Sequence, residues 1–242
     1  RETAGSAFVC LLSGRTPHGA AALGVGGEEA ATRRYLHLGT GNYNDSTAKI
    51  YTDLGLFTCR ESFGSDASSL FNVITGYSRP PEYQHFIVAP HGMRSFFVYM
   101  VQQEIENAKK GLASGITVKV NSLVDPELIE LLYEASQAGV PIKMIVRGIC
   151  CLIPGIEGVS ENITVVSIVG QLLEHSRIFR FENAGNPRIY MGSADWMPRN
   201  LDRRVELVFP IEDEKQKARA FSILDTMLSD TTNARYMQSD TS

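Results

Sequence analysis

Residues 172–195 read LLEHSRIFRFENAGNPRIYMGSAD, and this stretch decides the fold. Two apolar runs flank the turn-forming cluster NAGNP at 183–187, which predicts two antiparallel strands joined by a short turn. Along the first strand His175 and Arg177 alternate with Ser176, so the imidazole and the guanidinium share one face. The second strand closes in the small-residue turn GSAD. Together these groups can hold phosphoryl oxygens, attack phosphorus or carry a proton.

A related arrangement occurs earlier in the chain. The predicted strand RRYLHL is followed by the turn GTGN, as the strand RIYM is followed by the turn GSAD. The first glycines of the two turns are 192 − 39 = 153 residues apart. At that offset Asn42 matches Asp195, Tyr43 matches Trp196, Tyr51 matches Arg204 and Asp53 matches Glu206. A lone H-x-R strand is more often structural, and the repeat is what favours a functional reading. Two facing halves would place two phosphate-handling strands in one cleft.

The longer runs carry a family resemblance. RRYLHLGTGNYN, TAKIYTDLGLFT, VPIKMIVRGICCLIPGIEGVSENI, LLEHSRIFRF and GSADWMPRNLDRR resemble the polyphosphate kinases, within the phospholipase D-like superfamily. The resemblance runs from about Arg33 to Tyr236 and matches the C-terminal half of those enzymes, so the chain is expected to be a fragment. It implies an α/β, phospholipase D-like fold with two similar halves, each a mixed sheet flanked by helices.

The resemblance also implies a function. It is the reversible transfer of the ATP γ-phosphate to polyphosphate through a phosphohistidine, with ATP, ADP and polyphosphate as partners and Mg²⁺ accompanying ATP. His175 would be catalytic, and Tyr51, Arg147, His175 and Arg204 would bind the nucleotide or polyphosphate, with no metal ligand on the protein. A homo-oligomer of the full-length protein is expected, in the cytoplasm or at the inner face of the membrane.

Each of these residues has a structural alternative. Arg147 follows the buried run KMIV at the carboxyl end of a strand, where open α/β sheets bind ligands, but it could be an ordinary surface arginine. Tyr51 could be a core aromatic residue. The loop that carries Arg199, Arg203 and Arg204 could be solvated rather than a polyanion track. His91 and Arg94, at a helix start, could hold an anion. His37 and His85 are predicted to be structural.

The first half departs from the family pattern. Its H-x-K motif should precede the strand AFVCLLS, where Thr3 to Ser6 offer neither histidine nor lysine. His18 is a rival, but Gly19-Ala20-Ala21 follows it instead of a cation, and Gly14 to Thr32 are predicted to form a mobile loop. The fragment alone is therefore expected not to make polyphosphate.

Composition limits the other possibilities. The chain has 242 residues, of which 43% are hydrophobic and 21% are charged, and a net charge of −4, which argues against broad nucleic-acid binding. Cysteines at 10, 59, 150 and 151 have no metal-binding spacing and indicate a reducing compartment. No apolar run reaches the ~18 residues of a spanning helix.

The order of predicted elements divides the chain at about Gln84, into residues 1–84 and 85–242. The first part would hold strands at 7–13, 33–38 and 49–57 and a helix at 62–76, and would be incomplete at its N-terminus. The second would alternate strands and helices around a mostly parallel sheet. Two other functions remain open: a phospholipase D-type phosphodiesterase, and a non-catalytic polyphosphate-binding fragment.

Overall fold

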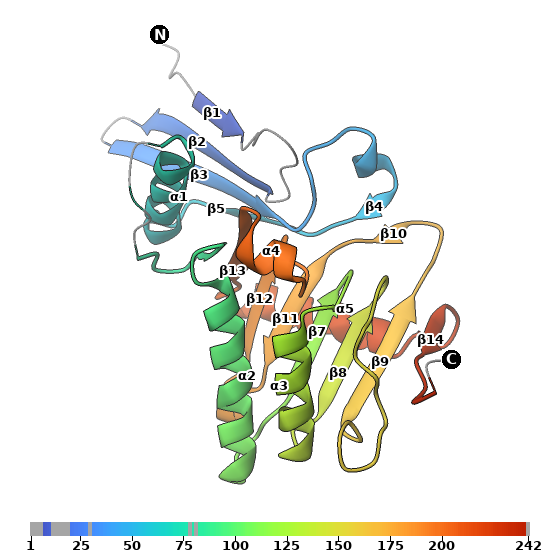
Figure 1. Ribbon diagram of the computed structural model, residues 1–242. Coiled ribbons are helices and arrows are strands. Elements are labelled where there is room, and N and C mark those ends of the chain that lie inside the picture. Colours follow the sequence, from blue (N-terminus) through green and yellow to red (C-terminus); the bar gives the residue numbers. More distant parts are fainter. Residues whose placement is uncertain (1–6, 11–19, 29–30, 77–78, 80–81, 241–242) are drawn as a thin grey trace.

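A computed structural model describes residues 7–10, 20–28, 31–76, 79 and 82–240 (Figure 1). The first half forms a four-stranded antiparallel sheet in the order β1-β2-β3-β5. Its strands are β1 (Ala7–Cys10), β2 (Ala20–Glu28), β3 (Ala31–Gly39) and β5 (Gly55–Thr58). Helix α1 (Glu61–Ile74) packs on the sheet through buried side chains that include Phe63 and Leu70.

The segment predicted to be a mobile loop contains a strand, so that prediction was wrong over Ala20–Glu28. The sequence AAALGVGGE has no apolar periodicity, yet all nine residues of β2 pair with β3, from Ala20 opposite Gly39 to Glu28 opposite Ala31. The long ladder satisfies the backbone groups, which is enough to hold a segment with few large side chains. Residues 11–19, including His18, and 1–6 lie outside the described residues.

The strand predicted over residues 49–57 is divided. A 3₁₀ turn (Thr47–Lys49) precedes the short strand β4 (Tyr51–Thr52), and β5 begins only at Gly55. A Cβ at Gly55 would lie 2.5 Å from Nε2 of His37, so only glycine permits this close approach. Because of this break, β4 pairs with β10 of the second half and β5 pairs with β3 of the first half.

The second half is built on an eight-stranded mixed sheet in the order β14-β9-β8-β7-β11-β12-β13-β6. In that order the strands are Ala234–Tyr236, Ile163–Ile168, Ile142–Val146, Ile116–Val120, Arg177–Phe181, Arg188–Gly192, Glu206–Pro210 and Ile87–Ala89. Strands β7, β8 and β9 are parallel to one another, and the remaining pairs are antiparallel. The sheet is mixed, but two of its seven pairings are parallel and five are antiparallel, so the prediction of a mostly parallel sheet was wrong. The antiparallel part comes from the hairpin β11–β12 and the strands beside it, and the described sheet of the first half is antiparallel throughout.

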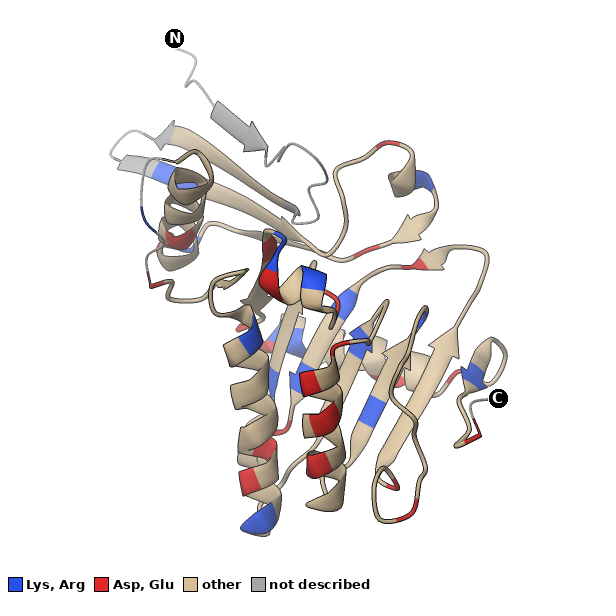
Figure 2. Ribbon diagram, in the orientation of Figure 1, with Lys and Arg blue, Asp and Glu red and all other residues tan. Residues whose placement is uncertain are grey.

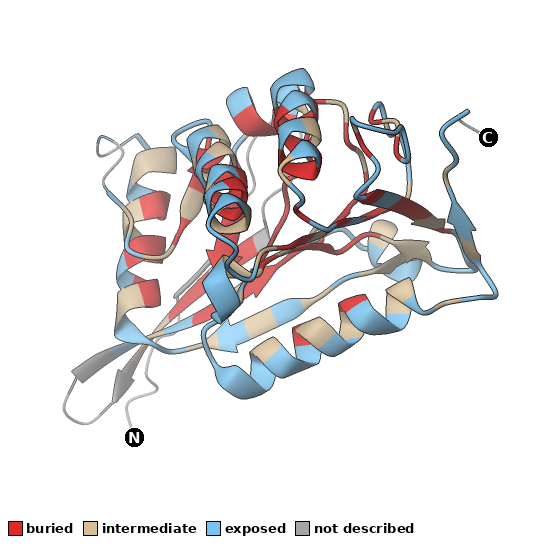
Figure 3. Ribbon diagram, turned by 90° about the horizontal axis from the view of Figure 1, so that it is seen from below, coloured by how far each residue is buried: buried red, intermediate tan, exposed pale blue. Residues whose placement is uncertain are grey.

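Helices cover both faces of this sheet. Figure 3 shows α2 (Met93–Lys109) and α3 (Pro126–Gln137) on one face and α5 (Glu214–Leu228) on the other. Asp125 caps α3, because its carboxylate accepts from the backbone N–H of Leu128 and proline follows it. The short α4 (Pro198–Asp202) lies between β12 and β13 in the sequence.

The central hairpin forms as predicted. Strands β11 and β12 pair from Arg177 opposite Gly192 to Phe181 opposite Arg188. Residues 183–185 adopt positive φ, with Asn183 at 47°, Ala184 at 55° and Gly185 at 89°. The strand that the sequence opens at His175 begins at Arg177, and His175 follows the two-residue strand β10 (Leu173–Glu174).

The two halves share a seam. Strand β10 of the second half pairs in parallel with β4 of the first. Residues from both halves also form one apolar core, which includes Leu38 and Leu70 of the first half and Ile178 and Leu224 of the second. Asp66 of α1 accepts from the backbone N–H groups of Gln84, His85 and Phe86 at 2.7–3.0 Å. These hydrogen bonds hold the segment that connects the two halves against α1. The division at Gln84 stays a prediction.

Candidate active site

His175 lies between the two halves and is 7% exposed. Its Nδ1 is 3.0 Å from Oδ1 of Asp53, and its ring centroid is 4.3 Å from that of Tyr51. The His175 backbone N–H donates to the carbonyl of Thr52 at 3.1 Å. A carboxylate only accepts hydrogen bonds, so Nδ1 of His175 is the donor in its contact with Asp53. The imidazole of the second half is therefore oriented by the first half.

Arg177 shares the face of His175, as the alternation predicts. Its Nη1 is 3.0 Å from Nε2 of His175 and donates to the carbonyl of Thr40 at 3.2 Å. Its Nε and Nη2 bond the two oxygens of Asp195 at 3.2 and 3.1 Å. Asp195 offsets part of the arginine charge and fixes the guanidinium plane. Arg177 thus joins the imidazole, the GSAD turn and the GTGN turn.

The internal repeat is reproduced in the hydrogen bonds of both halves. In the first, Thr40 N–H donates to the Leu54 carbonyl at 3.0 Å, Leu54 N–H donates to Thr40 Oγ1 at 3.0 Å, and Thr40 Oγ1 donates to Asp53 at 2.8 Å. In the second, Ser193 N–H donates to the Leu207 carbonyl at 3.0 Å, Leu207 N–H donates to Ser193 Oγ at 3.2 Å, and Ser193 Oγ donates to Glu206 at 2.5 Å. All three positions are separated by the same 153 residues, so the halves repeat one local structure.

The carboxylate that matches Asp53 has an altered pKa. Glu206 is fully buried and accepts from Ser193 and Asn200. Burial raises its pKa to about 7, against the opposing effect of the Ser193 hydrogen bond and of Arg177. A buried carboxyl whose pKa is near neutral pH, beside the candidate active site, is suited to proton transfer.

Strand register identifies the counterpart of Arg177 in the first half. Arg177 pairs with Gly192, and Ala20 pairs with Gly39. Since Gly39 and Gly192 are equivalent in the repeat, Ala20 occupies the position of Arg177, and His18 stands two residues before it as His175 does before Arg177. The argument that no strand follows His18 was therefore wrong.

The other predicted site residues differ in how directly they reach His175. Tyr51 stacks against its ring, as described above. Arg147 follows β8, and its Nε and Nη2 both donate to Asn121 Oδ1 at 3.2 Å. Asn121 Nδ2 in turn lies 3.4 Å from the carbonyl of His175. Arg204 is half-buried, and its pKa is lowered by burial and by Arg199. Figure 2 shows basic residues of the sheet and of α4 on the side that faces the first half.

One alternative anion site is removed by the structure. Arg94 does not face an open helix terminus but bonds three carboxylates, those of Asp125, Glu127 and Asp202, at 2.6–2.9 Å. These contacts raise its pKa further above its usual value. Arg94 therefore ties α2, α3 and α4 together, and through α4 it supports the loop that carries Arg204.

Sequence reasoning missed several residues of the site. Asp53 and Glu206 were matched to each other in the repeat, and that match was the available signal for their role. Lys119, on β7, and Asn121, which follows β7, gave none, because both are buried polar residues next to apolar ones. A buried polar residue in such a run has to find partners, and here those partners belong to the site.

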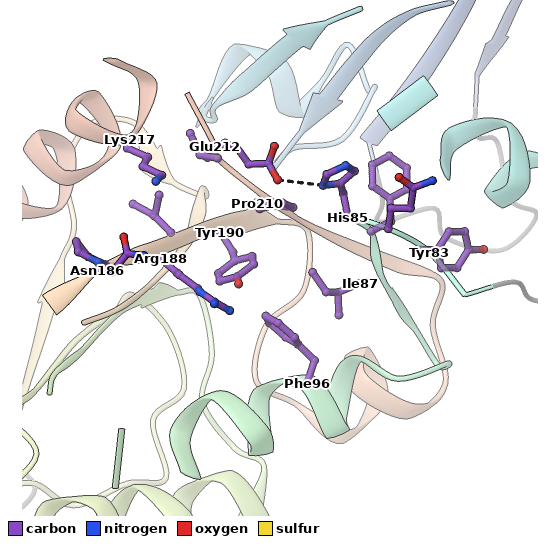
Figure 4. A pocket seen from close by; sticks show the side chains of 15 residues that line it. Tyr83, His85, Ile87, Phe96, Asn186, Arg188, Tyr190, Pro210, Glu212 and Lys217 are labelled. Carbon is purple, nitrogen blue, oxygen red and sulfur yellow. Dashed lines mark ion pairs between the residues drawn. The ribbon is translucent and has the colours of Figure 1, made fainter. Parts of the chain in front are cut away.

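A separate cavity of about 460 Å³ lies at the other end of the sheet (Figure 4). Arg188, in its lining, stands at the opposite end of β12 from Gly192. Glu212 and Lys217, in the lining of the cavity, already have protein partners, since Glu212 pairs with His85 at 3.0 Å and Lys217 pairs with Glu214 at 2.7 Å. This cavity is distinct from the candidate active site, and we assign no ligand to it.

Two family models cover nearly the whole chain. "Polyphosphate kinase C-terminal domain 1" matches residues 2–80, and "Polyphosphate kinase C-terminal domain 2" matches residues 86–242. Two consecutive domains of one family thus correspond to the two halves of the fold.

Individual proteins give the same result. A polyphosphate kinase of Synechocystis sp. is 53% identical over 99% of this chain and 33% of its own length, and one of Lactiplantibacillus plantarum is 49% identical over the same shares. The crystal structure of the Porphyromonas gingivalis polyphosphate kinase matches with a TM-score of 0.87 and 37% identity, over 92% of this chain and 35% of that one. The chain belongs to the polyphosphate kinase family and spans about a third of the length of these relatives.

Among the described residues, no helix is long and apolar enough to cross a membrane.

Proposed function

We propose that the chain is the part of a polyphosphate kinase that transfers the γ-phosphoryl group of ATP, reversibly, to the end of a polyphosphate chain through a phosphohistidine. The observation that supports the proposal most directly is the environment of His175. Its Nδ1 bonds Asp53, Arg177 Nη1 lies 3.0 Å from its Nε2, and Arg147 approaches it through Asn121, so a phosphoryl group would meet an oriented imidazole beside two arginines.

Two histidines divide the work in this proposal. His18, the counterpart of His175 by strand register, takes the phosphoryl group, and His175 carries the proton that the leaving or attacking phosphate exchanges. Asp53 keeps His175 in one tautomer, and Glu206 is the equivalent carboxyl for the first half. The placement of His18 lies outside the described residues, so its role rests on the register of β2 with β3.

Magnesium enters this proposal as part of the substrate. In the described part of the chain no three His, Cys, Asp or Glu residues gather in a way that could hold a metal. The carboxylates at the site already bond protein groups: Asp53 bonds Thr40, Asp195 bonds Asn121, and Glu206 bonds Asn200. In this proposal Mg²⁺ arrives bound to the phosphates of ATP.

A cytoplasmic location, and assembly of the longer protein into a homo-oligomer, belong to the same proposal and rest on the family alone.

Labelling tests the chemistry. Incubation with γ-labelled ATP and Mg²⁺ should place acid-labile, base-stable phosphate on the chain, and His18→Ala should remove it. His175→Ala should slow its formation without changing where it forms. Label on His175 instead of His18 would show that His175 takes the phosphoryl group and His18 carries the proton. If the chain retains no label yet binds tripolyphosphate, it is a non-catalytic polyphosphate-binding unit, which the alanine at position 20 favours.

A further inference from the structure

Lys119 is an unexpected residue at its position. It lies on β7 between Ile178 of β11 and Ile145 of β8, its register partners, and is only 2% exposed. Both isoleucines belong to the apolar core that spans the halves. A leucine would fit this environment without the cost of burying an ammonium group, so a lysine here has another reason.

The ammonium group contacts both sequence neighbours of His175. Lys119 Nζ donates to the Ser176 carbonyl and to Ser176 Oγ, each at 2.9 Å, and lies 3.5 Å from Oε2 of Glu174. His175 itself points the other way, toward Asp53 and Tyr51. The chain on either side of His175 therefore contacts a buried ammonium group that the imidazole itself does not touch.

We propose that Lys119 is a positioning residue of the phosphate site: it holds the backbone after His175 at Ser176, pairs with the side chain of Glu174 before His175, and adds a buried positive charge near the site. The proposal rests on the proposed function insofar as it concerns phosphate affinity. The positioning of the imidazole is independent of that function.

The charge on Lys119 depends on pH in a usable range. Burial lowers the pKa of Lys119 to about 8, while Glu174 on β10 opposes this shift. Of the other charged groups that face it, Arg177 on β11 lowers the pKa further and Asp53, after β4, raises it. The ammonium is thus charged at pH 7 and largely neutral at pH 10.

The first measurement is the affinity for inorganic tripolyphosphate, by calorimetry, in Lys119→Met and in the matched control Lys143→Met. Lys143 is exposed on the neighbouring strand β8, so both variants lose one lysine charge from the same sheet. We expect Lys119→Met to bind ~10-fold more weakly than the control at pH 7 and about equally at pH 10. Because the two variants are compared at the same pH, the ionisation of tripolyphosphate affects both affinities equally. Equal affinities at both pH values would overturn the proposal.

The second measurement is the Nδ1–H proton signal of His175, by NMR without ligand. We expect this signal, hydrogen-bonded to Asp53, to shift or broaden in Lys119→Met and to stay in place in Lys143→Met. If the unmodified chain fails to bind tripolyphosphate, the proposed function fails, and this signal alone decides the role of Lys119. An unchanged signal in Lys119→Met would refute the positioning role.

A third variant serves if Lys119→Met does not fold. Glu174→Gln removes the carboxylate that supports the charge of Lys119, so the alkaline loss of tripolyphosphate affinity should move to lower pH than in the unmodified chain. A loss at the same pH in both would overturn the proposal, because it would show that Lys119 does not govern that titration.

Discussion

Arg147 reaches the candidate active site through Asn121, and this contact uses only part of its guanidinium. Among the described residues its Nη1 makes no hydrogen bond. A planar, permanently charged group with N–H donors to spare suits a phosphate oxygen.

We therefore expect Arg147→Ala to weaken tripolyphosphate binding by about 1.5–3 kcal/mol, roughly 10- to 150-fold. Arg188→Ala, at the far end of β12, is the control and should leave the affinity unchanged. Calorimetry on both variants is the measurement, and equal affinities would remove Arg147 from the site.

Glu206 gives a prediction about pH. Its pKa is about 7 in the folded protein, above its ordinary value of 4.5, so between these values the folded state binds the proton and the unfolded state does not. Below pH 4.5 Glu206 is protonated in both states and does not lower the free energy of unfolding. As pH rises from 4.5 to 7 the unfolded state loses this proton first, so the free energy of unfolding falls.

Relative to Glu206→Gln, the unmodified protein should lose up to about 3 kcal/mol of unfolding free energy between pH 4.5 and 8. Urea unfolding of both proteins at pH 5 and pH 8 tests this. A stability difference that is independent of pH would show that Glu206 stays ionised.

At the scale of elements, Arg94 connects three helices. Asp125 is fully buried and also caps α3, so loss of Arg94 would leave its carboxylate without its cation. We expect Arg94→Ala to lower the unfolding free energy by ~3 kcal/mol and to weaken tripolyphosphate binding, because α4 supports Arg204.

Lys109→Ala is the control for Arg94. It breaks an exposed pair with Glu106 on the same helix and should cost less than ~1 kcal/mol. Urea unfolding compares the two. Similar small losses would mean that the three helices hold their places without Arg94.

The register of β2 leads to a prediction of gained function. Ala20 stands where Arg177 stands in the second half, so the first half lacks the cation beside its histidine. We expect Ala20→Lys to speed acid-labile labelling by γ-labelled ATP at least ~10-fold, the effect of one charge-assisted contact. Ala21→Lys, one residue along, is the control. An equal rate in both would contradict the equivalence of the two strands.

The elements differ in how far the sequence revealed them. The hairpin around residues 183–187 and helix α5 were predictable, because their turn and capping residues act locally. Strand β2 was not, because its only support is a ladder with β3, and neither alanine nor glycine marks it. The contact of Asp53 with His175 joins residues 175 − 53 = 122 positions apart, and only the match of Asp53 with Glu206 pointed toward it.

At the scale of the whole molecule, the two sheets are joined where β4 meets β10. The Leu173 N–H donates to the Ile50 carbonyl at 2.7 Å, next to the bond from His175 to Thr52. Leu173→Pro removes that donor, and the ring disfavours the pairing.

We expect Leu173→Pro to weaken tripolyphosphate binding and to divide one cooperative unfolding transition into two. The single tryptophan, Trp196, is buried in the second half and reports that half by fluorescence, while circular dichroism reports both. Leu172→Ala, beside it and exposed, is the control. Coincident fluorescence and dichroism curves in Leu173→Pro would show that the seam does not couple the halves.

The contact between Asp53 and His175 has a further consequence for how such a protein can change over time. The hydrogen-bonded pair of Asp53 and His175 has one member in each half, so neither half contains the pair by itself. A recombination point in the connecting segment would separate the imidazole from the carboxylate that selects its tautomer. The two repeats, although similar in structure, are therefore expected to be kept together by selection.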